Sequence, residues 1–210
     1  MSEQQFGFVS GRSTITQLLV TLNEWLFNLD NDLQVDAAYM DFRKAFDTVP
    51  HQRLLTKLKG YRIKGPILNW IESFLSNRQQ FVKINNAVSS RLHVTSGVPQ
   101  GSVLGPTLFI YFINDLPNVN SNIPMKIFAD DTKVYNKIEN DEDVTSLQKA
   151  IDEMFEWTEK WLLKFNKEKC KLLHLGNKNK RHEYFIGTGE NRIPLEKSDI
   201  EKDLGVYVLC

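Results

Sequence analysis

Three acidic residues interrupt the apolar segments of this chain, and their positions restrict how it can fold. Asp41 ends the apolar segment 34–40, and Asp130-Asp131 separate two further short apolar segments. An acid at the end of a buried strand is unfavourable unless it is paired or bound to a metal. Asp130-Asp131 alone would also fit an ordinary hairpin turn, where acids are frequent. The three positions therefore predict strands that end at one polar edge.

Carboxylates gathered on adjacent buried strands would repel one another unless divalent cations lay among them. Hard oxygen ligands of this kind suit magnesium or manganese. Two such ions about 3.5–4 Å apart can activate an attacking hydroxyl and stabilise a leaving phosphate oxygen. The residues alone thus allow two interpretations, a two-metal site and a plain turn.

Hydrophobic periodicity divides the chain into helices and strands in irregular order. We expect helices at 14–29, 66–74, 107–116 and 140–165, with residues 96–106 as a Gly- and Pro-rich loop. Strands are expected at 34–40, 79–84, 91–95, 125–129, 132–135, 171–175, 183–186 and 204–209. Because strands and helices mix without regular alternation, the fold class is α+β and not a doubly wound sheet.

Length and composition exclude several classes of protein. A chain of 210 residues makes one large domain or two small ones. Its two cysteines exclude a disulfide framework and a cysteine-rich zinc site. The longest nearly apolar run, 103–113, is too short to cross a bilayer, and no secretory signal is expected.

The net charge of zero weakens a nucleic-acid interpretation, but the charges are unevenly distributed. Residues 51–83 contain seven Lys or Arg and one acid, and residues 160–181 contain eight and one. Residues 139–159 contain eight acids and one lysine. The two basic stretches could face a polyanion while the acidic stretch faces water, or each could be a solvated helix face.

Six segments resemble, in order, the motifs of reverse transcriptases from non-LTR (LINE-type, jockey-like) retrotransposons. DFRKAFDTVPH (41–51), SGVPQGSVLGP (96–106) and FADD (128–131) resemble motifs A, B and C. QFGFVSGRST (5–14) resembles a segment of the fingers, WLLKFNKEKC (161–170) resembles motif D, and DLGV (203–206) resembles the start of motif E. A group II intron maturase or a retron enzyme is a less similar alternative. A metal-dependent nuclease would need neither the loop around Gln100 nor the aromatic ring of Phe46.

The resemblance implies a function and its cofactors. It implies RNA-directed DNA synthesis, in which a primer 3′-hydroxyl attacks the α-phosphate of a deoxynucleoside triphosphate. Asp41, Asp130 and Asp131 would hold two Mg²⁺ ions, or Mn²⁺, with the backbone carbonyl of Phe42 as a further ligand. Lys169 matches the lysine thought to protonate the pyrophosphate leaving group, although it is one cation among eight.

The resemblance also implies contacts to nucleotide and nucleic acid. Phe46 matches the aromatic residue that excludes a ribose 2′-hydroxyl, against the alternative of a core phenylalanine. Gln100 and Gly101 would contact the incoming nucleotide. Template and primer contacts are implied for Arg12, Gly97, Pro99, Ala129, Leu204 and Gly205, where Arg12 could instead support the fingers.

The fold implied is a polymerase palm, an antiparallel sheet packed on helices, with part of the fingers and no thumb. Fingers-like segments would be 1–34 and 61–95, the palm 35–60 and 96–190, and residues 191–210 the start of the primer-grip region. The primer-grip hairpin is expected to lack a strand, and Asp36-Ala37-Ala38 stand where the family has larger apolar residues.

The partners implied are an RNA template, a DNA primer and deoxynucleoside triphosphates, without a membrane. The missing fingers and thumb segments, or a longer polyprotein, are implied as well. The location would be intracellular, and nuclear for the parent element. An inactive remnant that at most binds nucleic acid weakly is the alternative function, and little activity is expected from this chain alone.

Overall fold

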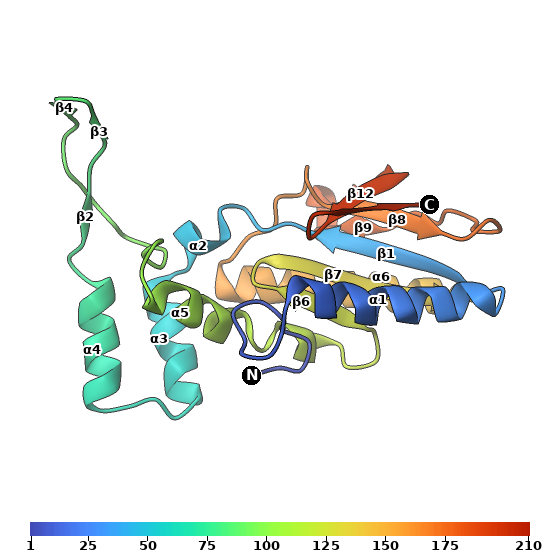
Figure 1. Cartoon of the computed structure of the whole chain (residues 1–210), viewed down its shortest axis with the longest axis horizontal. Coiled ribbons are helices and arrows are strands. Elements are labelled where there is room, and N and C mark those ends of the chain that lie inside the picture. The colour runs from blue at the N-terminus through green and yellow to red at the C-terminus, as the bar shows by residue number, and fades with distance from the viewer.

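The computed structural model describes residues 1–210, and its centre is a five-stranded sheet in the order β11-β8-β1-β7-β6 (Figure 1). All neighbours are antiparallel except β11 and β8, which are parallel. This antiparallel-dominated sheet, mixed with helices, confirms the α+β expectation. The strands are β1 (Gln34–Met40), β6 (Met125–Phe128), β7 (Asp131–Ile138), β8 (Lys171–Leu175) and β11 (Glu196–Ser198).

Successive residues of β1 pack into different layers, because side chains alternate across a strand. Ala38 and Met40 belong to the main core, whereas Val35 and Ala37 belong to a second cluster around Trp25. The main core is formed with α5 (Leu104–Ile113) and α6 (Asp141–Trp161). The second cluster is formed with α1 (Thr14–Asp30), which crosses in front of the sheet in Figure 1.

The two long helices begin at side chains that cap them. The Ser13 hydroxyl accepts a hydrogen bond from the Thr16 amide. The Asn140 side chain accepts hydrogen bonds from the amides of Glu142 and Asp143. Such caps stabilise a helix by satisfying amides that have no partner in the helix. Leu162, in the left-handed conformation, ends α6 four residues before the expected end.

A second group of helices carries a projecting hairpin (Figure 1). Pro66 stands in the first turn of α4, where its missing N–H costs nothing. The expected hairpin of residues 79–95 is present as four two-residue strands, and all of these strand residues are exposed. The elements are α2 (Ala45–Thr48), α3 (His51–Gly60), α4 (Pro66–Leu75), β2 (Gln79–Gln80), β3 (Lys83–Ile84), β4 (Ala87–Val88) and β5 (Leu92–His93).

The helix expected from residue 107 begins at Leu104, because Gly105 and Pro106 fit its first turn. It ends at Ile113 and is followed by the short helix η1 (Leu116–Val119).

None of the helices combines the length and the apolar character that a membrane span requires.

The last residues correct one expectation. The terminal hairpin has both of its strands, β12 (Ile200–Asp203) and β13 (Val206–Leu209), joined by a two-residue turn. Leu204 and Gly205 both have positive φ in this turn, and the sequence had placed Leu204 inside a strand. Before the hairpin lie β9 (Phe185–Ile186), η2 (Gly189–Asn191) and β10 (Ile193–Pro194).

Asp36, where the resemblance implied a larger apolar residue, is fully buried, and both oxygens of its carboxylate have partners. Its carboxylate accepts hydrogen bonds from Asn179 Nδ2 and Tyr184 Oη, each at 2.7 Å. His174 Nδ1 lies 2.7 Å from the same carboxylate. Burial and the charge of Asp36 raise the pKa of Tyr184, so its hydroxyl stays protonated as a donor. A buried charge is tolerated when it is hydrogen-bonded in this way.

Lys57 shows that the first basic stretch is not a uniform solvated face. Its side chain is 3% exposed and forms an ion pair with Asp115. Lys57 Nζ also donates to the Phe112 carbonyl at 2.6 Å, and it lies 4.3 Å and 4.0 Å from the ring centres of Trp157 and Trp161. This lysine therefore holds α3 against α5 and α6, and it does not contribute to a basic surface.

Candidate active site

The sheet brings the three acidic residues together, as the sequence predicted. They lie at the end of the sheet where β1 stops and β6 turns into β7, and this end is called the acidic edge or simply the edge below. β1 and β7 are antiparallel neighbours, and Met40 is paired with Thr132 at their ends. Asp41 follows β1 directly. Phe128 pairs with Asp131, so Ala129 and Asp130 form the two-residue turn between β6 and β7. Asp41 and the turn therefore lie beside each other.

The electrostatics of the three carboxylates are those of crowded like charges. Desolvation raises the pKa of Asp130, and the charge of Asp41 raises it further. Desolvation, with the charges of Asp130, Asp41 and Asp203, raises the pKa of Asp131 to about 6. Desolvation also raises the pKa of Asp41, which nearby Lys169 partly offsets. Such a cluster favours the binding of a cation, because a cation relieves the repulsion.

The donor set fits a magnesium or manganese site in its chemistry. No group of three His, Cys, Asp or Glu side chains of the chain is arranged so that it could hold a metal ion. Mg²⁺ usually keeps several waters and takes one or two protein carboxylates together with substrate phosphates. One or two of these carboxylates at an open edge, completed by water and substrate phosphates, are therefore compatible with such an ion.

The backbone around Asp41 is fixed by the segment that resembles motif D. The Asn166 amide donates to the Asp41 carbonyl at 2.8 Å, and the Arg43 amide donates to the Lys164 carbonyl at 2.8 Å. The ring of Phe42 stacks on Phe165, with ring centres 4.5 Å apart. The carbonyl of Phe42 accepts neither of these two backbone hydrogen bonds.

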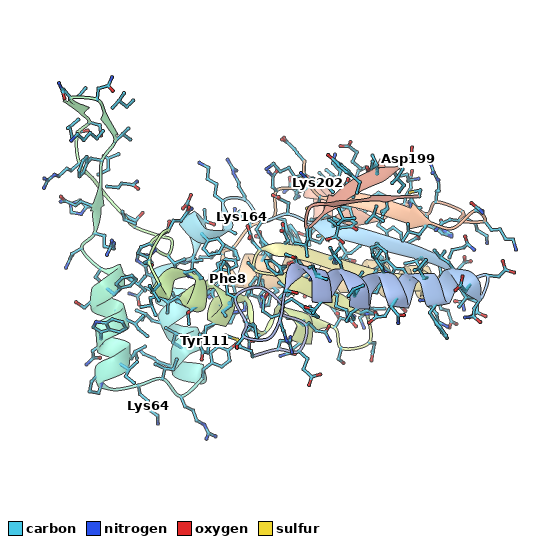
Figure 2. The ribbon with its side chains drawn as sticks, in the orientation of Figure 1. Phe8, Lys64, Tyr111, Lys164, Asp199 and Lys202 are labelled. Carbon is cyan, nitrogen blue, oxygen red and sulfur yellow. The ribbon has the colours of Figure 1, made fainter.

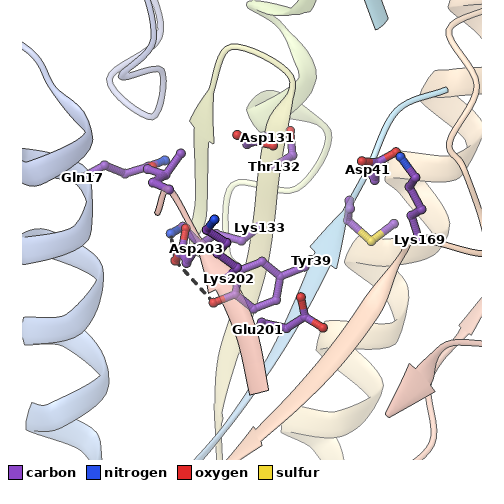
Figure 3. A pocket seen from close by; sticks show the side chains of 12 residues that line it. Gln17, Tyr39, Asp41, Asp131, Thr132, Lys133, Lys169, Glu201, Lys202 and Asp203 are labelled. Carbon is purple, nitrogen blue, oxygen red and sulfur yellow. Dashed lines mark hydrogen bonds and ion pairs between the residues drawn. The ribbon is translucent and has the colours of Figure 1, made fainter. Parts of the chain in front are cut away.

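A pocket of about 140 Å³ opens between this edge and the terminal hairpin (Figure 3). Asp41, Asp131 and Lys169 line it from the sheet side, and Lys169 extends toward Asp41. Asp203 and Leu204 line it from the hairpin. The pocket thus joins three residues predicted as catalytic to the hairpin whose turn was predicted to contact primer.

A buried ion pair attaches the terminal hairpin to the edge that carries the acids. Lys133, two residues after Asp131, pairs with Asp203, and their side chains are 4% and 6% exposed. The Tyr39 hydroxyl donates to the same carboxylate at 3.3 Å. Desolvation lowers the pKa of Lys133, and the charge of Asp203 opposes this change. Neither side chain was predicted to act here; only the place of Asp203 in the DLGV segment drew attention to it.

Phe46 packs partly into the core. Its ring stacks on Phe109 of the core with ring centres 4.2 Å apart, and Phe8 meets it edge-on at 6.3 Å. Phe46 is half-buried and Phe8 is exposed. Phe46, which belongs to α2, is thus anchored in the core while part of its side chain remains accessible.

The loop of residues 96–103 lies on α2. The amides of Gly97 and Val98 donate to the carbonyls of Val49 and Phe46, each at 2.8 Å. Gly97 has a φ of +89°, and a Cβ there would lie 2.6 Å from the Asp47 carbonyl oxygen. Only glycine allows this close approach.

Gln100 contacts Asp47, which is not one of the three acids of the candidate site. Its Nε2 donates to Asp47 Oδ1 at 2.8 Å. Gly97, Pro99 and Gln100 line a second pocket, of about 490 Å³, that contains none of the three acids. Gly101 follows Gln100 with a φ of +78°.

Arg12 supports the N-terminal segment. Its Nη1 donates to the carbonyls of Glu3 and Gln5 at 2.5 Å and 2.6 Å, and to that of Ser2 at 3.3 Å. The guanidinium also lies 5.2 Å from the ring centre of Phe6. Arg12 was expected either to contact the template or to support the fingers, and these contacts fit a supporting role.

Comparison with known proteins shows which family this chain resembles. Residues 1–205 match the family model of reverse transcriptase (RNA-dependent DNA polymerase). The RNA-directed DNA polymerase from mobile element jockey of Drosophila melanogaster is 36% identical over 183 residues, which is 83% of this chain and 20% of that protein. The probable RNA-directed DNA polymerase from transposon BS of the same species is 32% identical over 177 residues, 80% of this chain and 19% of that protein.

The chain spans about a fifth of the length of these curated relatives. A solved structure of apo telomerase from Candida tropicalis, truncated from its C-terminal domain, shares the fold. It has a TM-score of 0.62 and 13% identity over 99% of this chain and 39% of that one. The family match covers nearly every residue described above, and so this chain belongs to the reverse transcriptase family.

Proposed function

We propose that this chain is the catalytic part of an RNA-directed DNA polymerase. The observation that carries the proposal is that Asp41 lies beside the Asp130-Asp131 turn, at the ends of neighbouring antiparallel strands. The raised pKa values of all three acids support it, because they indicate a site that gains from a cation. The proposed partners are an RNA template, a DNA primer and deoxynucleoside triphosphates.

Asp41 and Asp130 would hold two divalent cations, with Asp131 and the Phe42 carbonyl beside them. When bound, the ions would activate the primer hydroxyl and neutralise the leaving pyrophosphate. Lys169, close to Asp41, would donate a proton to the leaving group. Its place in the pocket beside Asp41 supports this role over that of a general surface cation.

Phe46 would exclude ribonucleotides by lying under the sugar, and its stacking on Phe109 would keep the ring rigid. Gln100 and Gly101 would contact the incoming nucleotide. Because Gln100 now donates to Asp47, this role requires its side chain to exchange that partner for the nucleotide.

The nucleic acid would lie across the edge that carries the acids. Lys164 and Lys202 are exposed on the same side of the molecule in Figure 2, on segments that flank the end of β1 and the pocket. Other cations of the second basic stretch are engaged in ion pairs, including Lys171 with Glu196 and Lys178 with Asp32. Gly97, Pro99, Ala129, Leu204 and Gly205 would approach template or primer with their backbones.

We further propose that the sheet with α5 and α6 is a polymerase palm. Residues 61–95, with their projecting hairpin, and residues 1–34 would then belong to the fingers. The β12–β13 hairpin would be the primer grip, and its position across the pocket from Asp41 and Asp131 supports this assignment.

Primer extension on an RNA template tests the proposal. The purified chain, in excess over a labelled DNA primer, is given deoxynucleotides and Mg²⁺, and addition of the first nucleotide is followed. We expect slow extension that Asp130→Asn abolishes and that Glu142→Gln, at an exposed acid of α6, leaves unchanged. Salt-sensitive binding of the primer–template without Asp130-dependent extension would favour the alternative, a remnant that only binds nucleic acid.

A further inference from the structure

The turn that carries Asp130 is held from outside by a side chain of the N-terminal segment. Gln5 is 1% exposed, and its Oε1 accepts hydrogen bonds from the amides of Gly7 at 2.7 Å and Ala129 at 3.0 Å. Ala129 immediately precedes Asp130. The contact joins residues 124 positions apart in the sequence.

The turn needs such support because its backbone is unusual. Ala129 has a φ of +56°, a conformation that a residue with a Cβ adopts only under constraint. As a residue of the two-residue turn, Ala129 cannot direct its amide into the β6–β7 ladder. Without Gln5, that amide would be buried without a partner, because Ala129 is 5% exposed.

The backbone of the same segment fixes where Gln5 lies. Residues 4–6 run parallel to the edge strand β6: the Phe6 amide donates to the Ile127 carbonyl at 2.7 Å, and the Ile127 amide donates to the Gln4 carbonyl at 2.9 Å. A Cβ on Gly7 would overlap the Ala129 amide nitrogen and lie 2.9 Å from the Phe128 carbonyl carbon. Gly7 thus lets the segment lie directly against the turn.

The orientation of the Gln5 amide is determined by its two partners. Only an oxygen can accept from two N–H groups, so Oε1 must face Gly7 and Ala129. The Nε2 of Gln5 is buried and has no hydrogen-bond partner. A buried donor without a partner is destabilising, so this nitrogen offsets part of what Gln5 contributes by accepting from the two amides.

We infer that Gln5 is a positioning residue that fixes the turn carrying Asp130, and through it the direction of that carboxylate. Arg12 completes the support, since it binds the Gln5 carbonyl and stands directly before the capping residue of α1. This inference rests on the proposed function, in which Asp130 holds the cations.

Hydrogen exchange of single amides tests the contact directly. Gln5→Asn keeps the amide group but shortens the side chain. Gln4→Asn is the matched control, because the hydrogen bond of the Gln4 side chain is with Lys126, at 3.4 Å, and not with the turn. In Gln5→Asn we expect the Ala129 amide to exchange at least about tenfold faster relative to Val134, since one buried hydrogen bond is lost. Gln4→Asn should leave this ratio unchanged, and Gln5→Glu should retain protection because it keeps an acceptor oxygen.

Mn²⁺ binding followed by electron paramagnetic resonance tests the positioning role. Partners of metal ligands typically change affinity by about 10–100-fold when they are lost, so Gln5→Asn should weaken Mn²⁺ binding by roughly tenfold. Should Gln5→Asn fail to fold, Gln5→Met, of similar size and without an acceptor oxygen, replaces it.

Three results would separate the possible errors. Unchanged exchange of Ala129 in Gln5→Asn would overturn the contact. Faster exchange with unchanged Mn²⁺ affinity would overturn the positioning role and leave the proposed function intact. Wild-type Mn²⁺ binding that Asp130→Asn does not affect would overturn the metal site itself, and the role of Gln5 in directing a metal ligand would fall with it.

Discussion

Lys133 on β7 and Asp203 on β12 form an ion pair that is almost completely buried, and it joins the terminal hairpin to the edge that carries Asp41 and Asp131. Lys133 lies opposite Tyr39 in the β1–β7 register, and Tyr39 donates to the same carboxylate. The hairpin is therefore held at three side chains that surround the pocket beside Asp41.

Replacing Asp203 by Asn should destabilise the fold strongly, because it leaves the charge of Lys133 buried without compensation. A loss of about 3–5 kcal/mol in the free energy of unfolding is expected. The double variant Lys133→Met/Asp203→Leu should lose much less. Urea unfolding measures both, and Asp199→Asn, which breaks the exposed pair with Arg181, should cost at most about 1 kcal/mol. Equal losses in the single and double variants would contradict this account.

Lys57 should make stability rise with pH in a defined window. Burial lowers its pKa from 10.5 to about 8, whereas the unfolded chain keeps the ordinary value. Between about pH 8 and 10 the unfolded state therefore binds more protons, and the free energy of unfolding increases with pH. Wild type should gain on the order of 1 kcal/mol between about pH 8 and 9.5, and Lys57→Met should not. Urea unfolding at these two pH values measures the difference, and parallel pH profiles would exclude the effect.

Cation binding at the acids should weaken as the pH falls. Asp131 has a pKa of about 6, and the pKa of Asp130 is also raised. Below about pH 6, protons therefore compete with the ion for the same oxygens. We expect the Mn²⁺ affinity to fall several-fold between about pH 7.5 and 5.5. Electron paramagnetic resonance titration measures it, and Glu142→Gln should follow wild type; a pH-independent affinity would argue against these acids as ligands.

Phe46→Ala should relax the choice of sugar. With the ring removed, space opens for a 2′-hydroxyl, and incorporation of ribonucleotides relative to deoxynucleotides should rise by about tenfold or more. Single-nucleotide extension with each substrate measures the ratio. Phe109→Leu is the matched control, because it disturbs the same stack from the fully buried side. An equal effect of both variants would assign Phe46 to the core alone.

Local patterns in the sequence were sufficient to predict the elements that carry the acids. The helix of residues 14–30 and strand β1 follow from periodicity, which depends on residues close together in the chain. The neighbourhood of Asp41 and Asp130, which are far apart in the chain, was predicted from the acids at strand ends together with the motif resemblance. The terminal hairpin was mispredicted because its turn consists of Leu204 and Gly205, and a leucine with positive φ gives no sequence signal.

Contacts between distant residues could not be predicted in this way. Gln5 reaches a backbone amide, which has the same chemistry at every position, so no side-chain pattern marks its target. The sequence placed Lys57 in a basic stretch expected at the surface, but in the fold two indole rings of α6 lie next to its ammonium group. Gln100 was assigned from resemblance, and its hydrogen bond with Asp47 depends on how the loop lies on α2.

The buried carboxylate of Asp36 has a consequence for sequence variation. An apolar residue at this position would remove the acceptor of Asn179 and Tyr184 and the partner of His174 at once. The His174 and Tyr184 side chains would then be buried without this partner. The half-buried Asn179 would keep only its longer hydrogen bonds, to backbone carbonyls at 3.3 Å and 3.4 Å. The substitution is therefore unfavourable unless the partners change as well. Relatives with an apolar residue here are expected to differ at the other three positions too. The four sites should therefore covary as a set, and exchange of any one of them between homologues should be tolerated only when the others accompany it.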